Sequence, residues 1–187
     1  MVVGKIRILG IAGSLRKASF NKSILNAALE LLPEGAEMEI FNIDRIPLFN
    51  QDLEADLPKP VAEFKARIRA ANAILIATPE YNFSVPGVLK NAIDWGSRPD
   101  SDNSWKGKCV AIMSASNGMI GGERAQLHLR QSLVTLDMHQ VNKPEVIVSS
   151  VAGKLDRDGK LVDAHTREKI RELLAALVLL AVRFRDG

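Results

Sequence analysis

The chain has 187 residues, of which 47% are hydrophobic and 25% are charged, and its formal net charge is +3. These values are ordinary for a globular protein and suit one domain over residues 1–187, so they exclude a disordered chain. Acidic and basic residues are closely mixed, which excludes a basic stripe of the kind that binds nucleic acid.

The cysteine and histidine content excludes further classes of protein. The single cysteine, Cys109, excludes an intramolecular disulfide and favours a reducing cytoplasm. It lies in an apolar run, so we expect a buried, inert thiol. The three histidines lack metal-ligand spacing, and we expect no metal. We also expect no secretory leader and no membrane partner, because no uncharged stretch approaches the ~20 residues of a membrane span.

Apolar, β-branched runs alternate with segments of helical periodicity along the chain. The runs predict strands at residues 5–12, 38–41, 73–78, 108–114 and 138–148, the last interrupted at 142–144. The periodic segments predict helices at residues 19–32, 61–71, 85–95, 121–136 and 166–183. Residues 42–60 and 153–159 are predicted as irregular connections. Five strands alternating with helices are typical of an open, doubly wound, parallel α/β sheet covered on both faces.

Polar segments follow three of the predicted strands. They comprise residues 13–21, 78–87 and 114–122. In a doubly wound sheet, ligands bind beyond the carboxyl ends of the strands, where the strand order reverses. We therefore expect these three segments to share one ligand site.

The first segment combines a strand, a Gly-Ser turn and a helix start. Ser14, Ser19 and Asn21 could donate hydrogen bonds to phosphate oxygens, and Arg16 adds a fixed positive charge beside the positive end of the helix dipole. An alternative interpretation is that the serines and the asparagine cap the helix and that Arg16 is solvated. This stretch by itself leaves both interpretations open.

The other two segments suit a flat ring. Prolines restrict the second segment, whose N–H groups could bond the polar edge of a heterocycle while Tyr81 or Phe83 lies near a ring face. In the third segment, Gly118, Gly121 and Gly122 would let the backbone approach a ligand closely. The first segment lacks both the dinucleotide fingerprint and the P-loop. One phosphate and a flat polar ring describe FMN.

The three segments, taken in order, resemble the motifs of the NADPH-dependent FMN reductase family, most closely its chromate and quinone reductases. The resemblance spans nearly the whole chain. Its motifs are Gly13-Ser14-Leu15-Arg16-x-x-Ser19-x-Asn21, Pro79-Glu80-Tyr81-Asn82-Phe83-Ser84-x-Pro86-Gly87-x-Leu89-Lys90-Asn91-x-x-Asp94-Trp95, and Gly121-Gly122-x-Arg124 with His128-Leu129-Arg130.

The resemblance implies a flavodoxin-like sheet of order 2-1-3-4-5 and an FMN-dependent oxidoreductase. Hydride would pass from NADPH or NADH through FMN to quinones, free flavin, chromate, azo or nitro compounds by ping-pong kinetics, with no catalytic side chain. The family forms homodimers or homotetramers, with helices 89–95 and 121–136 as interface candidates. The implied FMN contacts are Ser14, Arg16, Ser19 and Asn21 at the phosphate and Pro79, Glu80, Tyr81, Asn82, Phe83, Ser84, Ser116 and Gly118 at the ring.

Several residues have an open role at this stage. The Glu80 carboxylate could act as a general acid, but we favour a structural partner, such as Lys90 or a second subunit. Arg98 could meet a phosphate of the pyridine nucleotide or lie solvated in its loop. Trp95 and Trp105 could flank the flavin, although packing is favoured for Trp95. The start of the helix near Gly121 could stabilise negative charge at the N1 and O2 edge of the reduced flavin.

Two positions depart from the chromate reductase pattern. Phe83 stands where a Tyr is common, and Leu127 stands where some relatives have another Tyr. In that branch this second Tyr joins dimers into tetramers, together with an Arg and a Glu that match Arg124 and Glu145. Leu127 cannot donate a hydrogen bond, so a tetramer is still compatible with the sequence but would lack the bond that this Tyr supplies.

Two other functions are compatible with a flavin site. A flavodoxin-like electron carrier is the main alternative, but flavodoxins are usually strongly acidic and their first loop lacks this Arg. A flavin-sensing protein without turnover is the second. Residues 50–58 and 98–105 are the candidate walls of the acceptor pocket.

Overall fold

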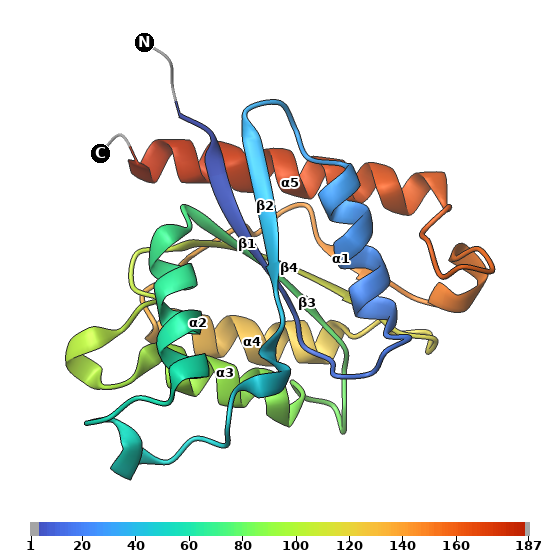
Figure 1. Ribbon diagram of the computed structural model, residues 1–187. Coiled ribbons are helices and arrows are strands. Elements are labelled where there is room, and N and C mark those ends of the chain that lie inside the picture. Colours follow the sequence, from blue (N-terminus) through green and yellow to red (C-terminus); the bar gives the residue numbers. More distant parts are fainter. Residues whose placement is uncertain (1–3, 186–187) are drawn as a thin grey trace.

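The computed structural model describes residues 4–185, and within them six strands form one parallel sheet (Figure 1). The strands are β1 (Ile6–Ala12), β2 (Ala36–Phe41), β3 (Ala73–Thr78), β4 (Cys109–Ala115), β5 (His139–Gln140) and β6 (Val146–Val148). The helices are α1 (Phe20–Glu30), α2 (Lys59–Ala70), α3 (Gly87–Ser97), α4 (Glu123–Thr135) and α5 (Ala164–Arg185). Four short 3-10 turns lie at Ile43–Arg45, Gln51–Leu53, Asp100–Asp102 and Val151–Lys154.

The strand order is β2-β1-β3-β4-β5, which confirms the predicted 2-1-3-4-5 order. The predicted fifth strand is split at the expected place. β5 pairs with the start of β4 through Cys109 and His139, and β6 pairs with its end through Met113 and Val146. Pro144 lies in the gap, where it has no N–H group to give to a ladder.

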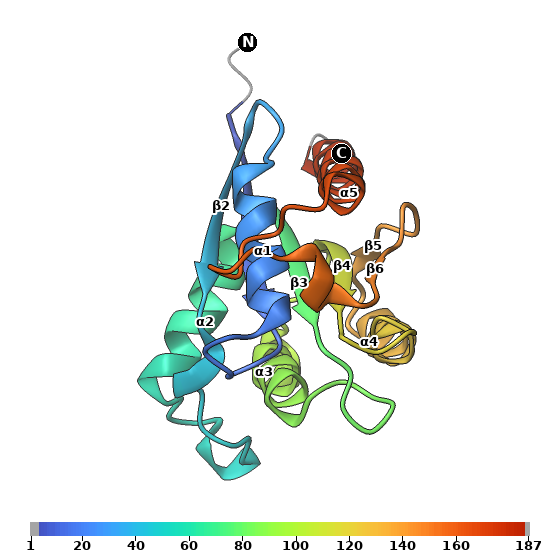
Figure 2. The same ribbon diagram turned by 90° about the vertical axis from the view of Figure 1, so that its right-hand side faces the viewer.

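Helices cover both faces of the sheet (Figure 2). Alternate side chains of the strands point to opposite faces, so Ile8 packs with α1 and α5, whereas Leu9 packs with α2, α3 and α4. Every residue of β3 and β4 is buried, as expected for central strands of a parallel sheet.

Helix boundaries differ from the prediction by a few residues for identifiable reasons. α2 begins at Lys59 rather than Val61, because Pro58 and Pro60 suit the first turn of a helix. α4 begins at Glu123 because Gly121 and Gly122 have positive φ angles of 66° and 93°, outside the helical region. β2 is two residues longer than predicted and lies at the sheet edge, as expected.

The buried side chains settle three sequence interpretations. Cys109 is buried, as predicted, and burial raises the pKa of its thiol to about 11, which disfavours the reactive thiolate. Both tryptophans are fully buried, so a place beside the flavin is wrong for Trp95 and Trp105 alike. Trp105 donates from Nε1 to the Ile93 carbonyl at 3.0 Å, and a Cβ at Gly96 would lie 2.3 Å from this Nε1.

No helix within residues 4–185 combines the length and the apolar character needed to cross a membrane.

Candidate functional site

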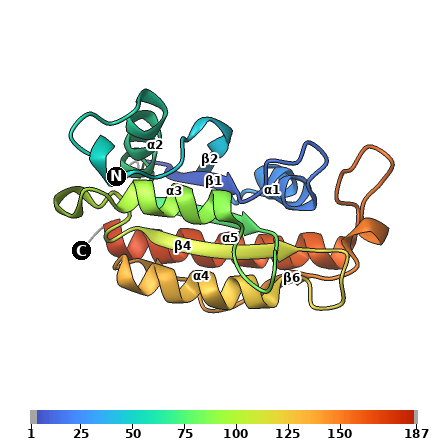
Figure 3. The ribbon, with the colours of Figure 1, turned by 90° about the horizontal axis from the view of Figure 1, so that it is seen from below.

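The three polar segments gather at one edge of the sheet, beyond the carboxyl ends of β1, β3 and β4 (Figure 3). The Gly13 N–H donates to the Ala77 carbonyl at 2.8 Å, and a Cβ at Gly13 would lie 3.0 Å from the Leu89 side chain and 3.5 Å from Pro79. The first and second segments are therefore in contact, as the topology predicted.

The start of α1 is open to a ligand. Ser19 is its N-cap residue but makes no side-chain capping bond, so the capping interpretation is wrong for Ser19. The first N–H groups of a helix have no partner inside the helix, and together with the dipole they favour an anion. Ser14 and Ser19 are both buried beside this turn.

Arg16 brings a positive charge to the same turn. Its guanidinium lies 5.8 Å from the centre of the Phe20 ring and donates to the Ala18 carbonyl at 3.5 Å. No carboxylate of residues 4–185 pairs with it. The charge is therefore free to meet an anionic ligand.

Asn21 has a structural task that was not predicted for its side chain. It is 1% exposed; its Nδ2 donates to the Ala115 carbonyl at 2.9 Å, and its Oδ1 accepts from the Ala115 N–H at 3.0 Å. One N–H and the oxygen of the amide fix α1 to the end of β4, across 94 residues of sequence. The second Nδ2 hydrogen is left as the candidate side-chain donor to a phosphate.

The second segment contains a β-hairpin with a two-residue turn, which was not predicted from the sequence. Tyr81 and Ser84 exchange two backbone hydrogen bonds of 3.0 Å, and Asn82 and Phe83 have φ angles of 50° and 63°. Two positive φ angles define a type I′ turn, whose usual Asn-Gly is here Asn-Phe. Because the hairpin uses the Tyr81 and Ser84 N–H groups, those of residues 80, 82 and 83 are the remaining candidates for a ring edge.

The hairpin is attached to α4 by side chains. The Arg124 guanidinium lies 4.1 Å from the centre of the Phe83 ring, and His128 Nδ1 lies 3.0 Å from Ser84 Oγ. Phe83 is still 63% exposed and Tyr81 46% exposed. His128 thus has a structural role, and both aromatic rings keep a free surface.

Glu80 caps α4 from another part of the chain. Its Oε2 accepts the N–H groups of Arg124 at 3.0 Å and Ala125 at 3.3 Å, and its Oε1 lies 3.6 Å from the Arg124 guanidinium. The expectation of a structural carboxylate is confirmed, but Lys90 is not the partner, since it pairs with Asp94 at 2.6 Å. The idea that the start of α4 stabilises a reduced flavin is also wrong, because Glu80 occupies that position.

The glycines of the third segment do different jobs. A Cβ at Gly121 would lie 2.7 Å from Ile147 Cγ2, and one at Gly122 would lie 2.9 Å from Ser114 Cβ. These two glycines let the backbone pack on the sheet, not on a ligand. Gly118 alone has open space, because a Cβ there would meet only Ser116 Oγ, at 3.5 Å. The same Ser116 Oγ accepts the Gly118 N–H at 3.1 Å.

Arg98 joins the two candidate pocket walls. Its Nε donates to Glu54 Oε1 at 2.7 Å, and its Nη1 pairs with Asp100. Lys65, which sequence reasoning overlooked, is buried beneath this loop and bonds the carbonyls of Arg98 and Asp102. Burial lowers the pKa of its ammonium group. The only indication of this burial in the sequence was that Lys65 follows Phe64 on a helix predicted to face inward.

Together these residues suit one phosphate and one flat ring. The uncapped start of α1, two buried hydroxyl groups and the free charge of Arg16 supply the phosphate donors. The hairpin and the open backbone at Gly118 can border a ring. The residues present therefore fit FMN. Within residues 4–185 there is no group of three or more His, Cys, Asp or Glu side chains that could hold a metal ion.

Comparisons with known proteins agree with this chemistry. The family described as NADPH-dependent FMN reductase matches residues 6–153. An NAD(P)H-dependent FMN reductase of Pseudomonas aeruginosa is 50% identical over 181 residues, covering 96% of this chain and 97% of the relative. An NAD(P)H:quinone oxidoreductase of Solanum tuberosum is 44% identical over 187 residues, covering 96% and 95%. The solved structure of FerB, a flavoenzyme NAD(P)H:(acceptor) oxidoreductase from Paracoccus denitrificans, aligns with a TM-score of 0.88 at 35% identity, covering 95% of this chain and 98% of FerB.

Proposed function

The chain belongs to the NADPH-dependent FMN reductase family, an oxidoreductase family that uses FMN and NAD(P)H, and on that premise we propose that it reduces quinones. Quinones are favoured because the Solanum tuberosum relative is named a quinone oxidoreductase. Free flavin, chromate, azo and nitro compounds are further candidate acceptors, because an exposed flavin face can reduce each of them. The acting unit is one domain, residues 1–187.

In this proposal the first segment holds the FMN phosphate. Ser14 and Ser19 donate their hydroxyl hydrogens, the first N–H groups of α1 donate along the helix axis, and Arg16 neutralises the charge. The Asn21 side chain keeps α1 at the correct distance from β4 through its two bonds to Ala115. The support is that α1 lacks a side-chain cap while its flanking hydroxyls are buried.

The second and third segments border the isoalloxazine ring. Pro79, Glu80, Tyr81, Asn82, Phe83 and Ser84 contribute mostly backbone, and Ser116 and Gly118 line the opposite edge. Bound FMN supplies the hydride-transfer chemistry, so no side chain of this chain acts as a nucleophile. Tyr81 and Phe83 keep exposed ring surface that can limit which acceptor lies over the flavin. Nucleotide and acceptor use this one face in turn, which gives ping-pong kinetics.

The observation that carries the proposal is the meeting of all three segments at the switch point of the sheet. The test is an acceptor panel of quinones, free flavin, azo dyes, nitroaromatics and chromate on the flavin-loaded protein, with NADPH and NADH. We expect parallel double-reciprocal plots with a quinone. Flavin absorbance that neither nucleotide bleaches would refute the proposal, and bleaching without turnover would favour an electron carrier.

We also propose that the protein is a cytoplasmic homodimer or homotetramer. Large apolar side chains are exposed on α4, where Leu127 and Val134 lie two helical turns apart on one side. Arg124 and Glu145 already have partners within the chain, Phe83 and Lys143 respectively. With Leu127 between them, the polar tetramer network is weakened, so we favour the dimer. Light scattering at several concentrations gives the state, and a monomer throughout would overturn the assembly.

A further inference from the structure

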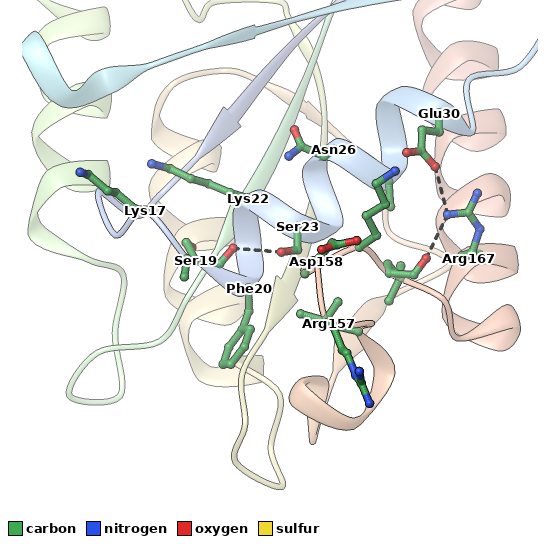
Figure 4. Close-up of a pocket in the computed structure, with 16 residues that line it drawn as sticks. Lys17, Ser19, Phe20, Lys22, Ser23, Asn26, Glu30, Arg157, Asp158 and Arg167 are labelled. Atoms are coloured by element: carbon green, nitrogen blue, oxygen red, sulfur yellow. Dashed lines mark hydrogen bonds and ion pairs between the residues drawn. The ribbon is translucent and has the colours of Figure 1, made fainter.

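A cleft of about 580 Å³ extends from the end of the first segment along the side of α1 (Figure 4). One wall is α1 with the turn before it, and the other is the connection 155–161 together with Arg167 of α5. The cleft begins at Lys17, Ser19 and Phe20, so it is continuous with the phosphate-binding end of the flavin site. Its volume is in the range of small-molecule sites.

The cleft is strongly basic. Five cationic side chains line it, and two carboxylates, Glu30 and Asp158, oppose them. Arg167 is neutralised by Glu30 at 3.2 Å. The other cations have no side-chain partner among residues 4–185, in contrast to most cations elsewhere on the chain. These four are Lys17, Lys22, Arg157 and Lys160.

The connection that carries two of these cations is built as a fixed turn. Asp156 Oδ1 accepts the N–H groups of Asp158 and Lys160, each at 2.9 Å, and Leu155 pairs with Leu161 as an antiparallel bridge. Gly159 supplies the positive φ of 77° that the turn needs. Arg157 and Lys160 are therefore held across the cleft from α1 by backbone geometry.

We propose that this cleft binds the phosphate-bearing adenosine half of NADPH, with the 2′-phosphate facing Arg157 and Lys160 and the pyrophosphate facing Lys17 and Lys22. The inference rests on the proposed function. FMN has one phosphate, which Ser14, Ser19 and Arg16 satisfy, so the remaining positive charge suits the phosphates of the second nucleotide. The partly buried ring of Phe20 offers an apolar surface for adenine (Figure 4). Arg and Lys are the side chains that recognise phosphate.

Direct binding of adenosine 2′,5′-bisphosphate to the flavin-loaded protein tests the assignment without any turnover. By calorimetry, the double variant Arg157→Ala/Lys160→Ala should bind the bisphosphate at least about tenfold more weakly, because two charge-assisted contacts are lost. The matched control is Arg183→Ala/Lys106→Ala, which removes the same charge from exposed positions outside the cleft. It should bind like the parent protein.

Two further measurements distinguish NADPH from FAD as the molecule whose adenosine phosphate occupies the cleft: steady-state kinetics, and a comparison of FAD binding with FMN binding. The double variant should raise the KM for NADPH about tenfold, leave the KM for NADH within about twofold, and keep kcat unchanged. Unchanged bisphosphate affinity would overturn the inference. So would a loss confined to FAD binding relative to FMN, because the cleft would then serve the adenylate of a flavin. A parent protein that binds the bisphosphate but does not oxidise NADPH would refute the proposed function and leave the cleft assignment standing.

Discussion

Two helices, α1 and α4, begin at the same edge of the sheet and end up with opposite surroundings. The start of α1 has no side-chain cap and lies between buried serines and the free charge of Arg16. The start of α4 is closed by the Glu80 carboxylate, which accepts two of its N–H groups. Both dipoles favour an anion, but only α1 leaves that place for a ligand.

This difference explains how the same edge of the sheet can bind a ligand and also hold its own loops in place. A second open helix start would attract a second phosphate next to the ring. Glu80 removes that possibility and, with the same contact, ties the hairpin of residues 79–84 to α4. In the proposed site, the ring end is therefore closed by the protein's own Glu80 carboxylate, whereas the phosphate end leaves the start of α1 open to the charge of a ligand.

Asn21→Leu should have the largest effect, because it disrupts the position of α1 itself. It leaves the buried N–H and C=O of Ala115 without partners, and we expect the free energy of unfolding to fall by about 4 kcal/mol. Urea unfolding of the flavin-free protein measures it. Asn26→Leu, at an exposed site on the same helix, should change the stability by less than about 0.5 kcal/mol. Equal stability of both variants would show that the Asn21 bonds do not fix α1.

Arg16→Ala tests the open end directly. Losing a charged contact to phosphate should weaken FMN binding roughly a hundredfold, while stability without FMN stays unchanged. Quenching of flavin fluorescence on titration measures the affinity. Arg45→Ala, which removes an exposed cation outside the site, serves as the control. An FMN affinity like that of the parent would remove Arg16 from the phosphate site.

Glu80→Ala tests the closed end. Removal of a cap that accepts two N–H groups should lower the free energy of unfolding by about 1–2 kcal/mol. We expect FMN affinity to fall less than about tenfold, because the phosphate contacts remain. Glu123→Ala, on the same first turn but exposed, should cost only a few tenths of a kcal/mol. If Glu80→Ala weakens FMN as much as Arg16→Ala does, the two helix starts do not have separate tasks.

The start of α5 is a third helix start, capped by a neighbouring residue, and here we expect the smallest effect. Asp163 Oδ1 accepts the Thr166 hydroxyl and the Thr166 N–H, the latter at 2.8 Å, and these bonds hold the pKa of Asp163 below its ordinary value. The stabilisation is present above the unfolded pKa of about 3.9 and is lost as pH falls through the lower folded pKa. Between about pH 5 and about pH 2 the parent should therefore lose up to about 1 kcal/mol more than Asp163→Asn. Parallel acid dependence of the two proteins in urea unfolding would contradict this.

The sequence by itself determined the architecture and the location of the candidate site. Apolar runs of strand length, helical periodicity and the glycine and proline punctuation are local signals, so they predicted β1, β3, β4 and the split fifth strand. The topology rule then placed segments 13–21, 78–87 and 114–122 at one edge, and the motifs within them carried the family resemblance. Hydroxyl groups and an arginine at a helix start are equally local, which is why a phosphate site could be predicted there.

Only the tertiary structure decided which side chains were still free to bind. Glu80 meets the start of α4 across 44 residues, and Asn21 meets Ala115 across 94 residues. A side chain at Gly121 or Gly122 would collide with residues of the sheet, so both positions require glycine. Trp105 can be buried because Gly96 has no side chain in the space that the indole occupies. Such pairings depend on the crossovers that bring distant segments together, and a residue's type does not reveal whether its polar atoms are already satisfied. That is why the sequence predicted a candidate site at this edge but did not show the structural bonds of Asn21 or the Glu80 cap at the start of α4.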